Sequence, residues 1–315
     1  MKRLVLYNKH RNLLPIVEYN TNEYYFINLI TCWKLTYPLQ LFINYKYRKI
    51  AFLWMLRYLN PLYILDVHWI SDISKICWYY DRKFGKKKKF IVVQHGVYTG
   101  GKIKRSFNEN FPYTNNFWVW SKFYQDNFFN IFKEKNLNIN IKIFGNPVYN
   151  HINRELFAYQ NIKEINRVLI APTALNMEYA KCLKELISKL NELQIEVNLK
   201  FHNFQNLSYF EEFKHLFVID NAFDLIQSSD YEAIICDVST LLLDTICFKK
   251  NVIYFQPILG IESFETTTVY DKYLENLFYY FRNDNFGQGV LKKLINQEKQ
   301  EDLFEFLAGS GNNIL

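Results

Sequence analysis

Short apolar runs alternate with stretches of helical periodicity through the second half of the chain, and this alternation constrains the fold more than any other feature. Strands are expected at residues 167–172, 196–201, 217–219, 231–236 and 251–255, and helices at 176–193, 207–216 and 239–248, with a helical turn at 221–228. Strands that alternate with helices predict a mainly parallel sheet with helices on both faces. Ligands of such sheets bind beyond the carboxyl ends of the strands, so the polar residues there are the candidates for function.

The first half of the chain repeats this pattern less clearly. Strands are expected at residues 3–7, 62–66, 89–93, 117–120 and 141–144, and helices at 70–80 and 122–133. Residues 148–166 connect the halves, and the tail at 270–307 predicts helices interrupted near 283–289. We therefore expect an α/β protein of two Rossmann-like domains, residues 1–150 and 151–315, that face each other across a cleft.

The composition fits such a protein. The chain has 315 residues, of which 50% are hydrophobic and 22% charged, as in a globular protein with a large core. Its five cysteines are widely spaced and form neither a CxxC pair nor a zinc pattern, which favours a reducing compartment. Cys236 and Cys247 lie in apolar surroundings, and we expect both to be buried as small hydrophobic residues.

The net charge of +7 suits an anionic partner such as a nucleotide or an anionic lipid surface, although a solvated surface without a specific partner fits equally well. A run of four lysines is read either as a solvated loop or as a contact with an anionic membrane; it comprises Lys86, Lys87, Lys88 and Lys89. One such run does not justify a nucleic-acid interaction. No stretch reaches the ~18 apolar residues that a membrane helix needs. We expect a cytoplasmic protein, soluble or peripheral on the inner face of the cell membrane.

The first candidate for chemistry is Gln94-His95-Gly96, which directly follows an apolar strand. This position directs an imidazole towards a ligand, and an imidazole can accept a proton near neutral pH. Gly96 would let a substrate approach the backbone closely. The alternative is a structural histidine packed on a loop.

The second candidate is Lys200-Phe201-His202, at the end of a predicted strand. Side chains two residues apart point the same way along an extended chain, so Lys200 and His202 could together hold a diphosphate. The alternative is a solvated strand end.

The third candidate is Asp237-Val238-Ser239-Thr240, where a predicted strand ends and a helix begins. Free backbone N–H groups and the helix dipole attract phosphate there, and the hydroxyl groups of Ser239 and Thr240 add donors. Helix capping by Asp237 or Ser239 is the alternative, although one loop can do both. Asp244 could receive ribose hydroxyls, or it could lie on a solvated helix face.

Several motifs are missing from the sequence. It contains neither a GxGxxG nor a P-loop, which argues against hydride transfer and ATP hydrolysis. It also lacks a DxD triplet and any cluster with metal-ligand spacing. We therefore expect chemistry that needs no metal and no cofactor beyond an activated donor substrate.

The ordered set of motifs resembles the CDP-glycerol glycerophosphotransferase family and related surface-polysaccharide transferases of the GT-B type. The matching segments are His95-Gly96, Gly145-Asn146-Pro147, Lys200-Phe201-His202 and Asp237-Val238-Ser239-Thr240 with Asp244. They span nearly half of the chain. The resemblance implies a transferase that moves a glycosyl or glycerol-phosphate group from a nucleotide donor to a surface glycan or lipid-linked acceptor.

The same resemblance implies a role for each matching residue. His95 would be the base that activates the acceptor hydroxyl, and His202 would bind the donor phosphate. Ser239 and Thr240 would form the phosphate-binding pair, and Asp244 would lie near the nucleotide or the transferred group.

Two positions depart from the family pattern. Asn203 stands where proline is usual, and Asn150 stands where aspartate is frequent. A CDP-, CMP- or UDP-linked donor is therefore compatible with the sequence. Two other kinds of function remain open, a nucleotide-sugar epimerase with the same two-domain fold and a non-catalytic nucleotide-binding or assembly protein.

Overall fold

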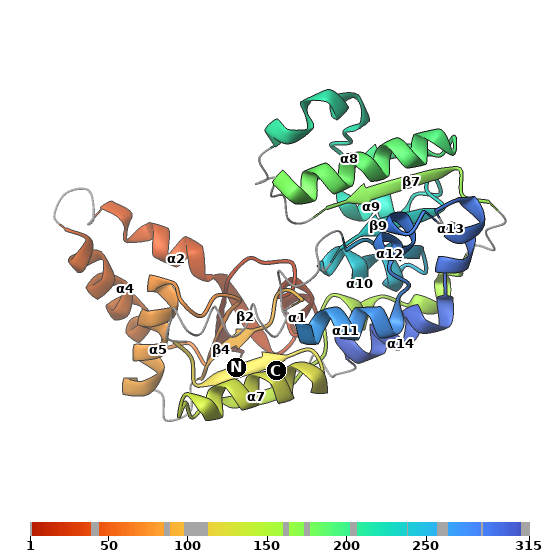
Figure 1. The fold of residues 1–315 in the computed structure, drawn as a ribbon. Helices are drawn as coiled ribbons and strands as arrows, with labels where there is room; N and C mark the ends of the chain where they lie inside the picture. Colours follow the sequence, from red (N-terminus) through yellow and green to blue (C-terminus); the bar gives the residue numbers. More distant parts are fainter. Residues whose placement is uncertain are drawn as a thin grey trace. The chain divides into compact units, whose positions relative to one another are not determined.

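A computed structural model of the chain describes residues 2–38, 44–84, 89–97, 113–159, 164–172, 177–201, 207–237, 239–256, 264–284 and 286–309. These residues form two compact units (Figure 1). The first comprises the described residues up to Ile152 and those from Phe306 onward, and the second comprises Asn153–Glu305. Each unit is built on one parallel sheet with helices, which confirms the predicted α/β class.

The sheet of the first unit has six parallel strands in the order β2-β1-β3-β4-β5-β6. They are β1 (Arg3–Tyr7), β2 (Tyr24–Asn28), β3 (Tyr63–Asp66), β4 (Lys89–Val93), β5 (Asn116–Val119) and β6 (Asn140–Ile143). Five of them match the strands expected from the sequence, and the edge strand β2 is an addition. The buried runs of β3, β4 and β5 occupy the middle of the sheet, as expected for strands covered on both faces.

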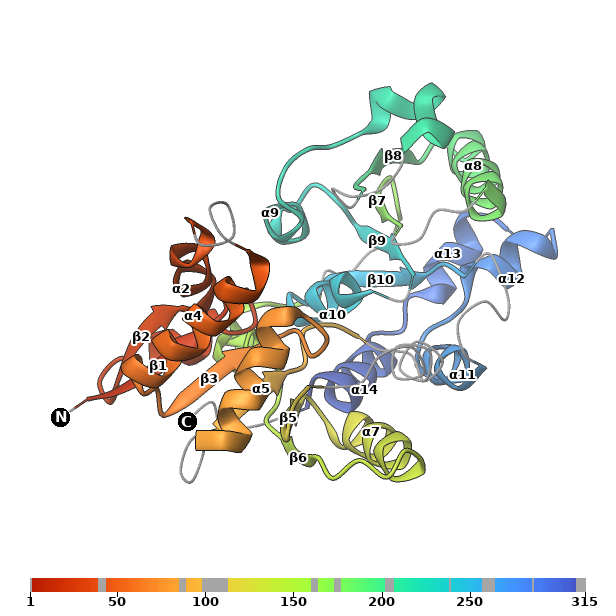
Figure 2. The same ribbon diagram turned by 90° about the vertical axis from the view of Figure 1, so that its left-hand side faces the viewer.

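Helices cover both faces of this sheet. They are α1 (Leu14–Tyr19), α2 (Leu29–Leu35), α4 (Tyr45–Leu59), α5 (Asp72–Phe84) and α7 (Lys122–Glu134), followed by the 3₁₀ turn η1 (Tyr149–His151). On one face, Phe117 of β5 packs against Phe128 of α7 with ring centroids 4.6 Å apart. On the other face, Leu13 and Ile16 join a cluster that includes Val5. Helix α4 lies against α5 and α2 (Figure 2).

The sheet of the second unit has four parallel strands in the order β10-β9-β7-β8. They are β7 (Arg167–Ala171), β8 (Glu196–Leu199), β9 (Ala233–Cys236) and β10 (Asn251–Tyr254). The strand expected at 217–219 is instead a single bridge between Phe217 and Leu199, because the chain turns away after one pair. All five cysteines are free and buried, which confirms the interpretation of Cys236 and Cys247.

Nine helical segments accompany this sheet within the described residues. They are η2 (Arg154–Leu156), α8 (Met177–Glu192), η3 (Leu207–Leu216), α9 (Ala222–Gln227), α10 (Thr240–Cys247), α11 (Phe264–Tyr273), α12 (Leu277–Arg282), α13 (Gln288–Leu294) and α14 (Gln297–Ala308). Helices α8, α12 and α13 cover one face of the sheet, and α9 covers the other (Figure 2). The sheet is therefore enclosed on both sides, as the apolar strands predicted.

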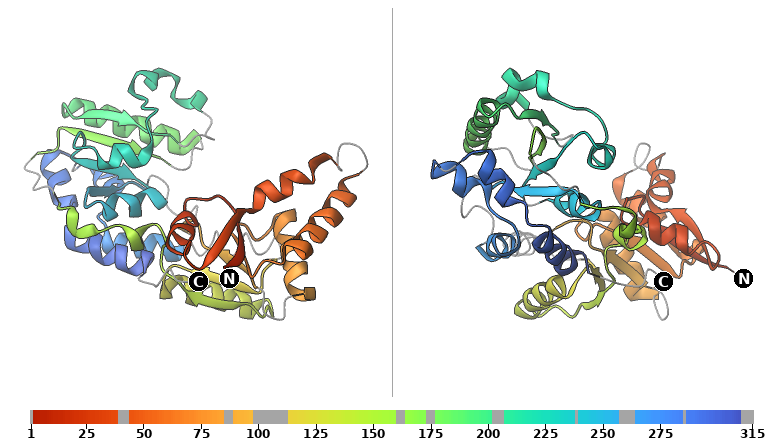
Figure 3. Two further views of the ribbon diagram at one scale, coloured as in Figure 1. Left: turned by 180° about the vertical axis from the view of Figure 1, so that it is seen from behind. Right: turned by 90° about the vertical axis from the view of Figure 1, so that its right-hand side faces the viewer.

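The end of α14 belongs to the first unit, although the sequence pattern placed the whole tail with the second half. The C-terminal end of α14, in dark blue, lies beside α7 (Figure 3). There the Phe306 ring lies 4.9 Å from that of Phe123 on α7. The Asn146 N–H donates to the Ala308 carbonyl oxygen at 3.0 Å. No helix within the described ranges is long and apolar enough to cross a membrane.

Candidate functional site

Three histidine side chains gather at one edge of the sheet in the first unit. His10 follows β1, His68 follows β3 and His95 follows β4, and these three strands are neighbours in the sheet. Because the strands are parallel, their carboxyl ends lie at the same edge. The centroid of the His95 ring lies 5.7 Å from that of His10 and 5.7 Å from that of His68. His95 thus belongs to a cluster of imidazoles, which we call the histidine cluster.

Two members of this cluster, His10 and His68, were not among the candidates chosen from the sequence. His10 and His68 each come within three residues of the end of an apolar strand, as His95 does, so the local signal was present. The spatial order of the strands, which brings the three together, is not visible in the sequence. Trp69 is a further neighbour, with its ring centroid 6.3 Å from that of His95, and it gives the cluster an apolar side.

Gln94 fixes the loop that carries His95. Its side chain is fully buried, donates from Nε2 to the Gly96 carbonyl oxygen at 2.9 Å and accepts the Trp120 N–H at 3.0 Å. Its backbone carbonyl oxygen accepts from the Trp120 indole at 3.0 Å and from the Asn12 amide at 3.2 Å. These four hydrogen bonds of Gln94 hold the backbone on both sides of His95. The Gly96 carbonyl oxygen accepts one of them.

His10 is kept neutral by its surroundings. Burial above all, and then the nearby Arg11 and His68, lower the pKa of this imidazole to about 4. Its Nδ1 accepts the Asn12 N–H at 3.3 Å, so in the neutral ring the proton resides on Nε2. His10 can therefore offer a hydrogen bond at neutral pH without placing a positive charge beside His95.

Asp66, the last residue of β3, supports the loop that carries His68. Its buried Oδ1 accepts from Asn8 Nδ2 at 2.9 Å, from the Val67 N–H at 2.8 Å and from the His68 N–H at 3.2 Å. Burial raises the pKa of this carboxyl group above its ordinary value, while those hydrogen bonds and His68 oppose the rise. Its contacts are with the loop backbone, with Asn8 and with the Ser74 hydroxyl, which donates to its Oδ2 at 3.3 Å, so we read it as a positioning group.

The second unit holds a cavity of about 530 Å³ at the carboxyl ends of its strands. It is lined by Ala171, Pro172, Lys200, Phe201, Ile219, Asp220, Asn221, Ala222, Ser239 and Leu241. Two of the residues chosen from the sequence, Lys200 and Ser239, therefore lie in one cavity although 39 positions separate them. The Lys200 ammonium lies 3.5 Å from the Ile219 carbonyl oxygen on the exposed side of the cavity.

Ser239 is the N-cap of α10. Its Oγ accepts the Leu241 N–H at 2.9 Å, as the capping interpretation expected. That bond uses an oxygen lone pair and leaves the hydroxyl proton available to another acceptor. Thr240 is the first residue of the helix. Capping and phosphate binding are therefore compatible at this serine.

Asp237 and Asp244 are both buried. Asp237 accepts a hydrogen bond from the Tyr179 hydroxyl of α8 at 3.0 Å, which ties the end of β9 to that helix. Burial, together with Asp237, raises the pKa of Tyr179 well above its ordinary value. The solvated helix face proposed as an alternative for Asp244 is wrong, because α10 buries every residue from Leu242 to Cys247. Neither carboxylate is among the residues that line the cavity.

Some of the expected site residues lie outside the described residues. These are His202 and, in the lysine run, Lys86, Lys87 and Lys88. Lys89 is exposed at the start of β4. In the part of the chain that the structure describes, no group of three His, Cys, Asp or Glu side chains could hold a metal ion. Chemistry without a metal stays a prediction.

Solved structures share this fold over nearly the whole chain. A putative UDP-N-acetylglucosamine 2-epimerase from Listeria monocytogenes is similar over 99% of this chain and 93% of its own, with 12% identity and a TM-score of 0.59. The UDP-GlcNAc 2-epimerase of Neisseria meningitidis, bound to UDP-GlcNAc, covers 100% of this chain with 96% of its own, at 11% identity and a TM-score of 0.55.

A glycotransferase of kitacinnamycin is similar over 100% of this chain and 97% of its own, at 9% identity and a TM-score of 0.55. No family model matches the sequence, and no curated protein matches it. At identities this low, similar structures establish the fold alone. The matches confirm the GT-B fold that the resemblance implied.

Proposed function

We propose that this protein is a transferase that uses a nucleotide-activated donor and moves a glycosyl or glycerol-phosphate group to a hydroxyl of a glycan or lipid-linked acceptor. The observation that carries the proposal is the cavity at the carboxyl ends of β7 and β8, which Lys200 and Ser239 line. GT-B proteins with a similar fold include one bound to UDP-GlcNAc, which supports a nucleotide donor.

The cavity has the chemistry for a diphosphate. Lys200 supplies an ammonium group, and Ser239 supplies a hydroxyl proton that its capping bond leaves available. The first turn of α10 adds backbone N–H groups and the positive end of the helix dipole. These groups would stabilise the negative charge that develops on the leaving phosphate, and they would do so without a metal ion. His202 is assigned to the same phosphate on the family resemblance.

The histidine cluster has the chemistry for activating a hydroxyl group. The acceptor proton passes to an imidazole nitrogen of His95 as the acceptor oxygen bonds to the transferred group. The bond from that group to the donor phosphate breaks, and its electron pair leaves on the phosphate. The neutral state of His10 helps, because a charged neighbour would oppose the positive charge that His95 gains.

A nucleotide-sugar epimerase remains the second candidate, because two of the similar structures are UDP-GlcNAc 2-epimerases. The two functions differ in their need for an acceptor. An epimerase acts on the nucleotide sugar without an acceptor. A transferase forms its transfer product only when an acceptor hydroxyl is present.

The test begins with the donor. The thermal unfolding midpoint of the full chain is measured with CDP-glycerol and with CMP-, UDP- and GDP-linked sugars, because a bound ligand raises the midpoint. Donor consumption and products are then followed with and without hydroxyl acceptors. Turnover that depends on an acceptor supports the transferase. Products without an acceptor support the epimerase, and binding without turnover supports a non-catalytic protein.

The base is tested with His95→Ala, whose turnover should fall by a factor of about 100 or more. Donor affinity should stay nearly unchanged, because His95 is not among the residues that line the cavity. The matched control is His215→Ala, which removes an exposed histidine at the end of η3 and should retain activity. If folded His95→Ala protein turns over as fast as the parent, His95 is not the base.

A further inference from the structure

Helix α4 of the first unit is apolar on both of its faces. The face towards the core buries Arg48, Phe52 and Leu56. The opposite face exposes Tyr47, Ile50, Trp54 and Tyr58, with exposed fractions of 52, 41, 60 and 89%. The spacing of three and four residues aligns these side chains in one stripe, about 16 Å long at ~1.5 Å per residue.

An ordinary surface helix in the same molecule shows how unusual this is. Helix α8 also buries an apolar face, but apart from Met177 its exposed positions carry polar or charged side chains such as Lys181 and Glu192. Single apolar side chains at a surface need no explanation, whereas a continuous stripe of them indicates a binding surface. The exposed side of α4 is such a stripe.

Positive charge accompanies the stripe. Lys46 and Arg57 are exposed on the same side of α4, and the Arg57 guanidinium lies 5.1 Å from the centre of the Trp54 ring. Residues 24–65 contain five Lys and Arg residues and no Asp or Glu. We call the exposed residues the α4 face; they are Lys46, Tyr47, Ile50, Trp54, Arg57 and Tyr58.

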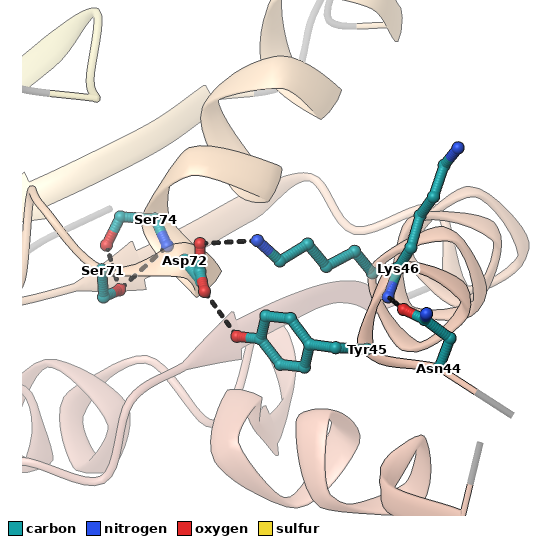
Figure 4. Close-up of polar contacts among 7 residues, drawn as sticks. Asn44, Tyr45, Lys46, Ser71, Asp72 and Ser74 are labelled. Carbon is teal, nitrogen blue, oxygen red and sulfur yellow. Dashed lines mark hydrogen bonds and ion pairs between the residues drawn. The ribbon is translucent and has the colours of Figure 1, made fainter. Parts of the chain in front are cut away.

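An acidic residue beside α4, Asp72, is already paired with groups of that helix. Asp72, at the start of α5, accepts a hydrogen bond from the Tyr45 hydroxyl and pairs with Lys49 at 2.9 Å (Figure 4). These two partners, Lys49 first, hold the pKa of Asp72 below its ordinary value. The charge of the Asp72 carboxylate is therefore balanced by Lys49, and it does not repel an anionic partner of α4.

We propose that the α4 face docks on an anionic lipid bilayer, with α4 lying in the plane of the interface. Tyrosine and tryptophan rings favour the level of the lipid headgroups, and lysine and arginine beside them bind lipid phosphates. A second copy of the chain fits less well, because pairing two such faces would bring like charges together. Lipid phosphates carry the opposite charge. The proposal goes beyond the transferase function and does not depend on it.

The test measures co-sedimentation of the full chain with vesicles of phosphatidylcholine alone and of an equal mixture of phosphatidylcholine and phosphatidylglycerol. Binding to the anionic vesicles should be strong and should weaken with salt. Arg57→Gln should lower the partition coefficient about fivefold, the usual contribution of one cation near such a surface. Trp54→Gln should lower it about tenfold or more.

A matched control is available in the same unit. Phe129→Gln removes an aromatic side chain of α7 with a similar exposed fraction, 56%, and should bind like the parent. Trp54→Phe should retain binding but lose part of the tryptophan quenching caused by brominated lipid. Nucleotide binding should be unchanged in both Trp54 variants, which separates a failure of this proposal from a failure of the proposed function.

Two outcomes overturn the proposal. One is binding of Trp54→Gln to anionic vesicles as tight as that of the parent, or no binding by either protein. The other is a dimer in solution that Trp54→Gln dissociates, with no vesicle binding, because the α4 face would then be an interface between copies.

Discussion

Replacement of Ser239 by aspartate separates helix capping from phosphate binding, because an aspartate retains the first and opposes the second. The Ser239 Oγ accepts the Leu241 N–H at 2.9 Å at the start of α10. Aspartate is an equally good N-cap, and its charge is favoured at the positive end of a helix dipole. The free energy of unfolding should therefore stay the same or rise by up to about 1 kcal/mol.

Donor binding should change in the opposite direction. The new carboxylate would lie in the cavity proposed for the donor diphosphate. Two unit charges about 4 Å apart interact by about 4 kcal/mol at an effective dielectric constant of ~20. If salt and side-chain motion remove half of this, the affinity still falls by about 2 kcal/mol, or roughly 30-fold.

The assay is calorimetric titration of the donor found by the ligand screen, with urea unfolding of the same proteins. Ser239→Ala is the comparison, since it loses the cap at a cost of about 1 kcal/mol but adds no charge. Asn44→Asp is the matched control, because Asn44 caps α4 in the first unit and lies outside the cavity. Unchanged donor affinity in Ser239→Asp would refute the assignment of the cavity, and a large loss of stability would refute the capping argument.

Two further predictions concern stability. His10 has a folded-state pKa of about 4 against an ordinary value of 6.5, so stability should fall as pH drops from about 6.5 to about 4, because the unfolded chain binds the proton more readily. His10→Gln should flatten that dependence in urea unfolding between pH 7 and pH 4.5, and an identical slope in both proteins would contradict it. Gly309 has φ +64°, and a Cβ there would lie 2.1 Å from the Trp120 carbonyl oxygen. Gly309→Ala should therefore lower the free energy of unfolding by at least about 1 kcal/mol. Its control is Gly289→Ala on α13, where space is open and the change should stabilise by about 0.5–1 kcal/mol; equal thermal shifts for the two would contradict the argument.

The second half of the chain could be predicted well because its strands and helices differ in period. The run at 167–171 is apolar without interruption, and α8 shows a helical repeat, so local pattern and final structure agree. Ser239 could be placed at a helix start because a strand must end before it and a capping residue is recognisable.

The region from α1 to α4 could not be predicted in this way. Helix α4 has apolar side chains on both faces, so its sequence lacks the one-sided repeat that identifies a surface helix. The edge strand β2 exposes Tyr25 and Ile27, and this apolar exposure hides the alternation typical of an edge strand. An apolar side chain on the exposed face therefore removes the signal on which the prediction relies.

The histidine cluster suits the hydroxyl activation that the proposed transfer needs, whereas the fold alone does not distinguish transfer from epimerisation. The described carboxyl group beside the cluster, Asp66, is buried and bonded to Asn8 and to the backbone of the His68 loop. The groups that remain for proton transfer are imidazoles, and His10 is held neutral next to His95. A neutral imidazole with an uncharged neighbour can accept a hydroxyl proton as the new bond forms, which is the demand of group transfer to an alcohol.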